Sequence, residues 1–544
     1  MKTPLDLADE LGAPTEGRIP YGDFAVKLSP ALLHAQAPRS SESRLILVSA
    51  LTPTPAGEGK TTTTIGLGDA LRRRGESVCL ALREPSLGPC FGMKGGGTGG
   101  GAAQLTPSER INLHFTGDFH AITSAHNLLA AALDSHLHFG GEPAIDPRSV
   151  LWPRVMDMNE RALRQVTIGL GGRTSGMPRE SSFDITAASE LMAILCLASD
   201  EADLRERIDR ITVGLTSGGD PVLASSLGVT GAMMALLSDA LSPNLARTLE
   251  GTPALVHGGP FANIAHGCNS LTATRVAMHL ADYCVTEAGF GFDLGGEKFL
   301  DIKCRLGGLE PAAVVLVATV RALKLHGGRT VSELDQPDIG ALERGLENLE
   351  RHLESVAAFG QRPVVAINRF PGDTQEELDR LQELLEERGV PVAIASHFAE
   401  GGAGALELAD RVRDLAAGGP CPVRLAYDLS DPLEVKLEKV VRAVYGGRGV
   451  QLTSRARKDL ARLERLGQTD LPICVAKTQN SLSDDGTRRG RPRDFDITVR
   501  GLQLNSGAGF IVVLTGDLMR MPGLPRDPQA RRIDLVDGAI TGLR

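Results

Sequence analysis

The stretch Thr52-Pro53-Thr54-Pro55-Ala56-Gly57-Glu58-Gly59-Lys60-Thr61-Thr62 decides the fold of this chain. An apolar run, Arg44–Ala50, precedes it, and a segment with helical periodicity, Thr61–Arg74, follows it. A glycine-rich loop between a strand and a helix suits phosphate, because its backbone N–H groups and the helix N-terminus converge on phosphate oxygens. We therefore predict that this loop binds ATP, with Lys60 at the terminal phosphates and the Thr61 hydroxyl on Mg²⁺.

This loop departs from the general phosphate-loop pattern GxxxxGK[ST] at one position, where Thr54 takes the place of the first glycine. Without its context, Gly59-Lys60-Thr61 would fit an ordinary helix N-terminus equally well. The preceding strand, the further glycine at position 57 and the following helix favour phosphate binding over that alternative.

Short apolar runs alternate with longer segments of helical periodicity along most of the chain. The candidate strands are Arg44–Ala50, Ser77–Leu82, Ile211–Leu215, Ala254–Val256, Tyr283–Thr286, Ala313–Ala318, Pro363–Ile367, Pro391–Ala395, Pro472–Ala476 and Gly509–Leu514. Several are continuously apolar, which is typical of parallel strands covered on both faces. The alternation predicts an α/β fold with a mostly parallel, phosphate-loop NTPase-like sheet in a large N-terminal domain.

Small-residue loops follow three of these strands directly: Thr216–Asp220, His257–Pro260 and Glu287–Gly291. Because ligands bind outside the carboxyl ends of strands in open parallel sheets, we predict that these loops line one site, although any single one of them also fits an ordinary turn. Another glycine-rich run, Lys94–Gly101, fits either a flexible linker or a close approach of the backbone to a ligand. Its position inside a domain favours the close approach.

At 544 residues the chain is too long for a single hydrophobic core, so several domains are expected. We predict a large domain at residues 1–355 and two smaller α/β domains at residues 356–450 and 451–544. The charged helical segment Val331–Gly360 lies at the first boundary, and Gly418–Pro422 is a candidate linker.

Composition narrows the functional classes. A net charge of −9 and a pI of about 5.8 give no overall field that would favour nucleic acid or an anionic membrane. Met1–Asp9 lacks the regions of a signal peptide, and no apolar run reaches the ~18 residues of a membrane helix. The eight cysteines form no CxxC pair and predict buried free thiols of a reducing cytoplasm. A local basic cluster, Arg488–Arg493, fits either a solvated loop or an anchor for an acidic substrate tail.

Several longer motifs resemble those of formate–tetrahydrofolate ligase, also called 10-formyltetrahydrofolate synthetase. In the first half of the chain these motifs are Arg83–Pro89, Phe91–Gly96, Ile111–Asp118, Leu249–Ala254 and His257–Gly267. In the second half they are Ala366–Pro371, Ala476–Gln479, Leu482–Asp485 and Leu514–Asp517. The resemblance runs from Gly22 to the end, and motifs of this length make chance similarity implausible.

The resemblance implies ATP-dependent ligation of formate to tetrahydrofolate through formyl phosphate, giving 10-formyltetrahydrofolate, ADP and phosphate. It assigns Arg83 to the formyl phosphate, as a bidentate donor to anionic oxygens. It makes Glu84 and Asp118 candidates for positioning metal or substrate, although each fits an ordinary hydrogen-bonded loop carboxylate equally well. Phe370 and Phe398 match two aromatic positions that sandwich the pterin ring, against the alternative that both are core residues.

For the predicted domains, the resemblance implies that residues 1–355 bind nucleotide and formyl phosphate and that residues 356–450 carry the folate-stacking aromatics. Residues 451–544 would contribute to the nucleotide site. The resemblance also implies ATP with Mg²⁺, tetrahydrofolate as co-substrate, a monovalent cation such as K⁺ or NH₄⁺, a homotetramer and a cytoplasmic location. No nucleic-acid or membrane partner is expected.

The chain departs from the family pattern at several positions. Phe398 stands where the family usually has Trp, and Glu400 stands where it usually has a basic residue. Ala102 and Asn480 each replace a common Tyr, and Val513 replaces a common Pro. We expect a divergent but active enzyme with altered pterin affinity or specificity.

Three other functions compete with this hypothesis. One is another ATP-dependent ligase on the same scaffold, acting on a different small acid such as carbonate. Another is a nucleotide-switched binding protein, which is disfavoured because Thr54–Glu58 contains no lysine and Arg531–Arg544 has no strong apolar face. The third is an inactive homologue that only binds folate, which the intact Lys60 and Arg83 disfavour.

Overall fold

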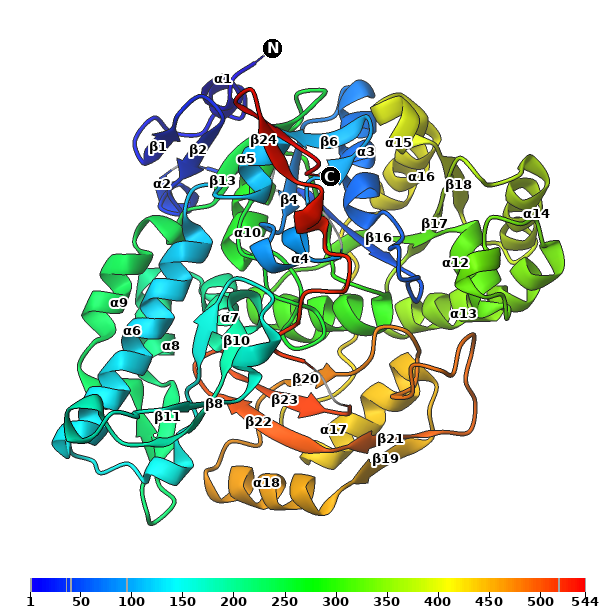
Figure 1. Ribbon diagram of the computed structural model, residues 1–544. Coiled ribbons are helices and arrows are strands. Elements are labelled where there is room, and N and C mark those ends of the chain that lie inside the picture. The colour runs from blue at the N-terminus through cyan, green and yellow to red at the C-terminus, as the bar shows by residue number, and fades with distance from the viewer. Residues whose placement is uncertain (1, 36, 40–41, 94–95, 517–518, 544) are drawn as a thin grey trace.

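The computed structural model describes residues 2–35, 37–39, 42–93, 96–516 and 519–543. Its central feature is a 12-stranded sheet whose middle strands all run parallel (Figure 1). In order across the sheet these strands are β14 (Pro253–Val256), β4 (Val78–Leu82), β15 (Tyr283–Glu287), β3 (Arg44–Ala50), β16 (Pro311–Ala318), β17 (Pro363–Asn368) and β18 (Val392–Ala395). The predicted α/β fold with a mostly parallel sheet is confirmed.

Antiparallel strands extend this sheet beyond β14. They are β13 (Asn244–Thr248), β2 (Ala25–Leu28), β1 (Arg18–Tyr21), β6 (Ala103–Thr106) and β5 (Gly99–Gly100). β5 is part of the glycine run, and its pairing with β6 fastens that run to the sheet.

Both faces of the parallel strands are buried, as their continuous apolar sequences predict. Along β3, Leu45 and Leu47 belong to one core while Ile46 and Val48 belong to another, because successive side chains point to opposite faces. The covering helices are α10 (Leu271–Leu280) and α13 (Ile339–Ala358) in the first core, and α3 (Lys60–Arg73) and α16 (Leu406–Ala416) in the second.

One predicted strand forms as β11 (Thr212–Leu215) but lies outside the main sheet. It pairs antiparallel with β12 (Pro221–Leu223), and the Thr216 N–H donates to the Asp220 carbonyl at 2.9 Å. Gly219, with φ of 88°, supplies the left-handed residue of the turn. The loop is therefore a hairpin turn, and the prediction that it lines a site with the other two loops is wrong.

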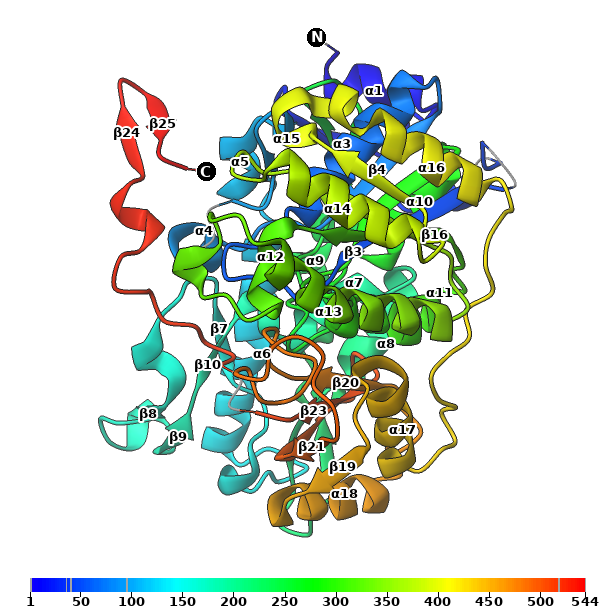
Figure 2. The same cartoon turned by 90° about the vertical axis from the view of Figure 1, so that its right-hand side faces the viewer.

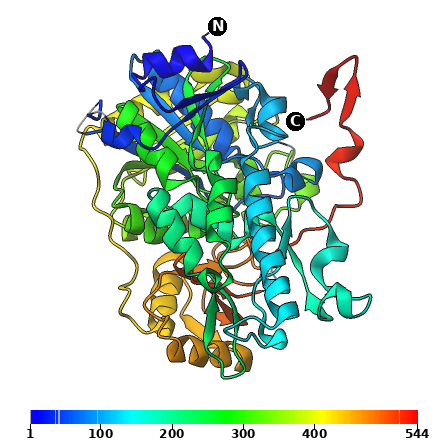
Figure 3. The same ribbon diagram turned by 90° about the vertical axis from the view of Figure 1, so that its left-hand side faces the viewer.

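Two further groups of elements lie beside the main sheet (Figure 1). The first contains α6 (Asp118–Phe139), α7 (Glu190–Leu197), α8 (Glu201–Asp209), α9 (Thr230–Leu237), β7 (Arg154–Met156) and β10 (Phe183–Ile185), with α6 running along its length in Figure 3. The second contains α17 (Leu433–Val440), α18 (Ser454–Arg465), β19 (Gly449–Leu452), β20 (Ile473–Ala476), β21 (Asp496–Val499), β22 (Gly501–Asn505) and β23 (Phe510–Leu514). In Figure 2, α13 crosses between the main sheet and this second group.

The sheet continues across the first predicted domain boundary. Residue 355 lies inside α13, and both β17 and β18 join the main sheet beyond it. The division of the chain into domains stays a prediction. Shorter elements used below are α12 (Val320–His326) and α15 (His397–Glu400).

The eight cysteines are buried free thiols, as predicted. Burial raises the pKa of the Cys90 thiol to about 12, so it stays protonated at neutral pH. Among the described residues, no helix combines the length and the apolar character needed to cross a membrane.

A buried ion pair ties the C-terminal strands to the main sheet. Nζ of Lys477, just after β20, lies 2.7 Å from Oδ2 of Asp293, in the segment that follows β15. Both side chains are almost fully buried, and Nζ also donates to the carbonyl groups of Thr478 and Ser481. Each charge is therefore stabilised mainly by its partner, because burial keeps water away from both.

We expect Lys477→Met to lower the unfolding temperature strongly, because the Asp293 charge would stay buried without a partner. Breaking such a pair costs about 3–5 kcal/mol. Thermal unfolding followed by circular dichroism measures the effect. Lys439→Met is the matched control: Lys439 pairs with Asp431 at 2.6 Å but is 40% exposed, and such pairs contribute about 0–1 kcal/mol. Equal shifts in the two variants would contradict the expectation.

Candidate functional site

The loop predicted to bind phosphate connects β3 to α3, and two of its glycines are needed for its shape. Gly57 and Gly59 have φ of 82° and 76°, in the left-handed region that favours glycine. A Cβ at Gly59 would also collide with Nδ2 of Asn368. Because α3 begins at Lys60, the positive end of the helix dipole lies at the loop.

The side chain of Glu58 closes this loop from within. Its carboxylate accepts the Thr54 N–H at 2.6 Å and the Thr319 hydroxyl. Nδ2 of Asn368 donates to the Glu58 carbonyl at 3.0 Å. The backbone of Thr54 stays outside the left-handed region, so this position does not require glycine. The departure from the general pattern therefore leaves the loop intact.

Thr52, at the start of the loop, is fixed by three side chains from helices behind it. Its N–H donates to Oδ1 of Asn348 at 3.3 Å, and its carbonyl lies 2.8 Å from Nε2 of His326. Its hydroxyl lies 3.0 Å from Nε2 of His352. Burial lowers the pKa of His352 to about 4, so this support is uncharged at neutral pH.

Glu287, the last residue of β15, connects the loop to Arg83. Its Oε2 accepts the Thr61 hydroxyl at 2.7 Å, and its Oε1 lies 3.5 Å from Nη2 of Arg83. The structure thus brings the two parts of the predicted site to one carboxylate. Sequence analysis noted Glu287 only as the start of a loop; its position at a strand end was the available signal.

Arg83 retains hydrogen-bonding capacity. Nη1 reaches the Pro260 carbonyl only at 3.4 Å, and Nε is buried without a partner. Gly289 lies directly against the guanidinium, because a Cβ there would be 2.9 Å from Nη1. The next residue, Phe290, has φ of 58°, which is strained for a bulky side chain. An arginine held this loosely can bind an anion with several N–H donors.

The two predicted carboxylates have different surroundings. Asp118 is engaged on both oxygens, by Nζ of Lys27 at 2.7 Å and by Nδ2 of Asn244 at 2.8 Å. Glu84 is buried, and its Oε2 has no hydrogen-bond partner. Burial raises the pKa of Glu84 well above its ordinary value, and the charge of Asp118 raises it further. Sequence analysis gave no sign of Lys27, which lies far away in the chain.

Phe370 and Phe398 follow neighbouring parallel strands, β17 and β18. Phe398 is 49% exposed and Phe370 is half-buried, so neither is a core residue. The guanidinium carbon of Arg321 lies 3.7 Å from the centroid of the Phe370 ring and covers one of its faces. We call Phe370 and Phe398 the aromatic pair.

The glycine run approaches the aromatic pair. Lys94 and Gly95 lie outside the described residues. A Cβ at Gly100 would be 3.2 Å from Cε2 of Phe398, and the Ala102 N–H donates to the Phe398 carbonyl at 2.8 Å. The described part of the run is packed against protein, so a flexible linker is excluded there. The predicted close approach is made to Phe398.

The loop that contains the basic cluster packs against α13, where two of its arginines form ion pairs. Arg491 pairs with Glu354 at 2.7 Å, and Arg493 lies 3.4 Å from Glu347. The N–H of Gly490 donates to Nδ1 of His326 at 3.1 Å. The cluster therefore belongs to a surface loop that is fixed against the residues that hold Thr52, which agrees with the alternative of a solvated loop; its use as an anchor for an acidic substrate tail stays a prediction.

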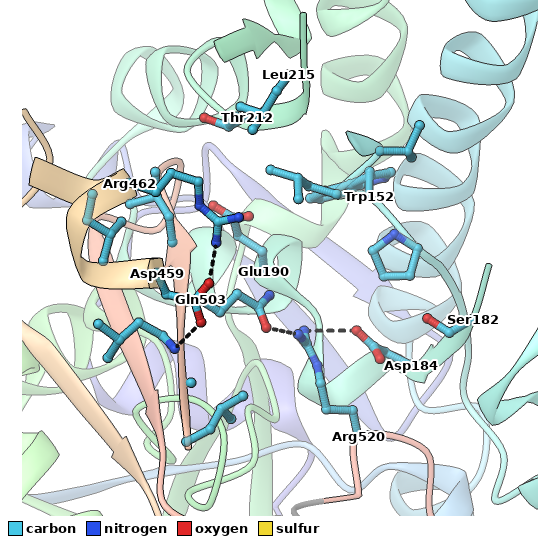
Figure 4. A pocket seen from close by; sticks show the side chains of 18 of the residues that line it. Trp152, Ser182, Asp184, Glu190, Thr212, Leu215, Asp459, Arg462, Gln503 and Arg520 are labelled. Carbon is cyan, nitrogen blue, oxygen red and sulfur yellow. Dashed lines mark hydrogen bonds and ion pairs between the residues drawn. The ribbon is translucent and has the colours of Figure 1, made fainter. Parts of the chain in front are cut away.

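A separate cavity of about 400 Å³ lies between the C-terminal strands and the elements around α6 (Figure 4). None of the predicted site residues lines it. Ion pairs occupy two of its walls: Arg520 with Asp184 at 2.8 Å and Arg462 with Asp459 at 3.1 Å. Burial raises the pKa of Glu190, which also lines the cavity, to about 7.

Comparisons with known proteins agree with the sequence resemblance over the full length. The family described as "Formate–tetrahydrofolate ligase" matches residues 1–544. A curated protein named formate–tetrahydrofolate ligase, from Zymomonas mobilis subsp. mobilis, is 54% identical over 545 residues. That alignment covers 100% of this chain and 98% of the relative.

We expect Glu190→Gln to stabilise the protein at pH 8 but not at pH 4.5. An ordinary glutamate carboxyl has a pKa of 4.5. Burial raises the pKa of Glu190 to about 7, although the N–H groups of Gly507 and Ala508 donate to it and act in the opposite direction. Between pH 4.5 and pH 7 the carboxyl ionises in the unfolded state but stays protonated in the folded state. Ionisation therefore favours unfolding, and the free energy of unfolding of the wild type falls by about 3 kcal/mol over this range. Glutamine does not titrate.

Unfolding temperatures at the two pH values measure this difference. Glu16→Gln is the control, because Glu16 is exposed. If the difference in unfolding temperature between the wild type and Glu190→Gln is the same at both pH values, the Glu190 carboxyl titrates normally and the expectation is wrong.

Proposed function

The chain belongs to the formate–tetrahydrofolate ligase family and ligates formate to tetrahydrofolate with ATP, and we propose that it does so at the carboxyl edge of its main sheet. In this proposal the loop of residues 52–62 binds ATP and Arg83 binds the formyl phosphate intermediate. Phe370 and Phe398 bind the pterin ring.

The reaction needs formate to be activated, because hydroxide is a poor leaving group. A formate oxygen attacks the γ-phosphorus of ATP, the bond to ADP breaks, and formyl phosphate forms. The N10 amine of tetrahydrofolate then attacks the formyl carbon and loses a proton, and phosphate leaves. Both steps gather anionic oxygens, so positioning and charge stabilisation supply most of the catalysis.

The Glu287 carboxylate is the observation that carries the proposal. It contacts the Thr61 hydroxyl on the nucleotide side and the Arg83 guanidinium on the other side. A phosphoryl group transferred from ATP at the loop is therefore already within reach of the Arg83 guanidinium. Arg83 then holds the new mixed anhydride through its unused N–H donors.

Mg²⁺ fits the residues at the start of α3. The Thr61 hydroxyl and the Glu287 carboxylate place two oxygens 2.7 Å apart, and hard cations prefer oxygen ligands. These two residues would hold the ion, which when bound neutralises charge between the β- and γ-phosphates. Lys60 contacts the same phosphates from the first position of the helix.

Glu84 and Asp118 suit different tasks. Asp118 is held by Lys27 and Asn244, which suits a positioning role. Glu84 has a buried oxygen without a partner, which suits contact with substrate or with a monovalent cation. K⁺ or NH₄⁺ would place a positive charge beside this oxygen and favour its ionised form.

The family relationship supports the remaining parts of the proposal. They are a homotetramer, a cytoplasmic location, and the absence of nucleic-acid and membrane partners. The contribution of residues 451–544 to the nucleotide site has structural support, since Gly490 contacts His326 and Lys477 pairs with Asp293 close behind the loop.

We expect Lys60→Ala to lower turnover by about 10²–10³-fold, because one charge that stabilises the transferring phosphoryl group is lost. Chromatography of 10-formyltetrahydrofolate formed from formate, ATP and tetrahydrofolate measures it, with thermal unfolding to check the fold. Lys439→Met again serves as the surface control. Near-normal turnover in Lys60→Ala would contradict the loop assignment. Wild-type protein that acts on carbonate but not on formate would favour the alternative ligase.

We expect Phe398→Trp to lower the KM for tetrahydrofolate by about 2–10-fold, because a larger ring stacks more strongly on the pterin. The value of kcat should change little, since Phe398 is not assigned to the reacting atoms. Steady-state kinetics with varied tetrahydrofolate measure both constants. Phe139→Trp is the control, because Phe139 is 81% exposed. If Phe398→Trp leaves the KM for tetrahydrofolate unchanged, residue 398 does not stack on the pterin.

A further inference from the structure

Arg321 contacts both the phosphate loop and the aromatic pair. It lies in the first turn of α12, whose capping residue Thr319 donates to Glu58 in the loop. Its guanidinium carbon is 3.7 Å from the Phe370 ring centroid, and Nη2 is 3.5 Å from the Gly57 carbonyl. Its Nε is buried without a partner. One guanidinium therefore contacts both the loop proposed to bind ATP and the ring proposed to bind the pterin.

Hydrogen bonds fix the backbone around Phe370 on both sides of the residue. The Phe370 N–H donates to Oδ2 of Asp373 at 2.8 Å, and the Asp373 N–H donates back to the Phe370 carbonyl at 3.0 Å. Two residues earlier, Asn368 donates to the Glu58 carbonyl at 3.0 Å. The ring is thus connected to the loop through its strand on one side and through Arg321 on the other.

We propose that Arg321 is a positioning residue that couples nucleotide binding to folate binding, so that each ligand tightens the binding of the other. The inference rests on the proposed placement of ATP in the loop of residues 52–62 and of folate on the aromatic pair. It adds a residue and a thermodynamic linkage that this placement does not require.

The sign of the coupling follows from the shared arginine. Phosphates draw the backbone N–H groups of the loop inward, which orders the loop and with it the Gly57 carbonyl. The contact from Nη2 is long, so it can shorten when its acceptor is fixed. An ordered Arg321 then fixes the Phe370 ring, and the second ligand bears less of the ordering cost. Linkage makes the effect equal in both directions.

The guanidinium also decides which face of Phe370 takes the pterin. Arg321 covers one face at stacking distance, so the ligand stacks on the opposite one. A planar guanidinium can stack on the ring while donating at its edge, whereas a lysine ammonium cannot do both. The coupling should therefore depend on the shape of the side chain as well as on its charge.

Calorimetric titration of tetrahydrofolate, with and without saturating Mg²⁺–ADP, tests the proposal. We expect ADP to lower the folate Kd of the wild type about 5-fold or more. In Arg321→Met the ratio of the two Kd values should fall to about 1, and Arg321→Lys should lose most of the coupling as well. The Kd of ADP measured without folate should stay within about threefold of the wild-type value in both variants, since the arginine is not assigned to the phosphates.

Arg369→Met is the matched control. Arg369 precedes Phe370 and is exposed, and in the described structure only its backbone N–H is bonded, to Ala395. This variant removes one positive charge from the residue next to Phe370 and leaves Arg321 in place, so the coupling ratio should persist. A reverse titration, ADP into the folate complex, must give the same ratio in the wild type.

Three results would overturn the inference. A wild-type ratio of 1 with both ligands bound removes the coupling and leaves the proposed function standing. If Arg321→Met keeps the wild-type ratio of folate Kd values, the coupling does not depend on Arg321. A tenfold or greater loss of ADP affinity without folate makes Arg321 a direct phosphate ligand. Failure of the wild type to bind ADP or tetrahydrofolate alone would instead overturn the proposed function, and the inference with it.

Discussion

The Glu287 carboxylate contacts both parts of the proposed site, the Thr61 hydroxyl at the start of α3 and the Arg83 guanidinium. In the proposed mechanism Lys60 and Arg83 both act on the transferring phosphoryl group, and an anion at the end of the strand between theirs offsets part of their mutual repulsion. The sheet order β4, β15, β3 puts that anion in place. Since neighbouring strands lie about 4.8 Å apart, the strand ends on either side of β15 are separated by about 10 Å.

The same edge of the sheet continues without a break to the proposed folate site. Beyond the loop, β16 leads to Thr319 and Arg321, and the next strands lead to Phe370 and Phe398. The glycine run then returns from the antiparallel end of the sheet to contact Phe398. In sheet order the strand ends therefore carry Arg83, Glu287, the loop of residues 52–62, Arg321 and the aromatic pair, so the loop lies between the arginine and the aromatic pair on one hydrogen-bonded framework.

Much of this arrangement could be predicted because it depends on local patterns. Continuous apolar runs identified β3 and β16, and glycine spacing identified the loop. Strand order could not be predicted, because it depends on packing between distant segments; hence Glu287 was not singled out between the loop and Arg83. The hairpin of β11 was missed because a short apolar strand has the same pattern in either kind of sheet. Arg321 begins an ordinary helix, and only the tertiary structure reveals its two contacts.

Two of the family departures are neighbours in space. The Ala102 N–H donates to the Phe398 carbonyl, and a Cβ at Gly401 would lie 3.6 Å from Cβ of Ala102. The Tyr-to-Ala and Trp-to-Phe departures therefore act on the same wall of the proposed pterin site. The glycines beside them carry no side chains that could replace the lost dispersion contacts. Phe370 has one face covered by Arg321 and offers the other, so in the proposed site it supplies a larger share of the pterin affinity than it would beside the larger rings of the family pattern.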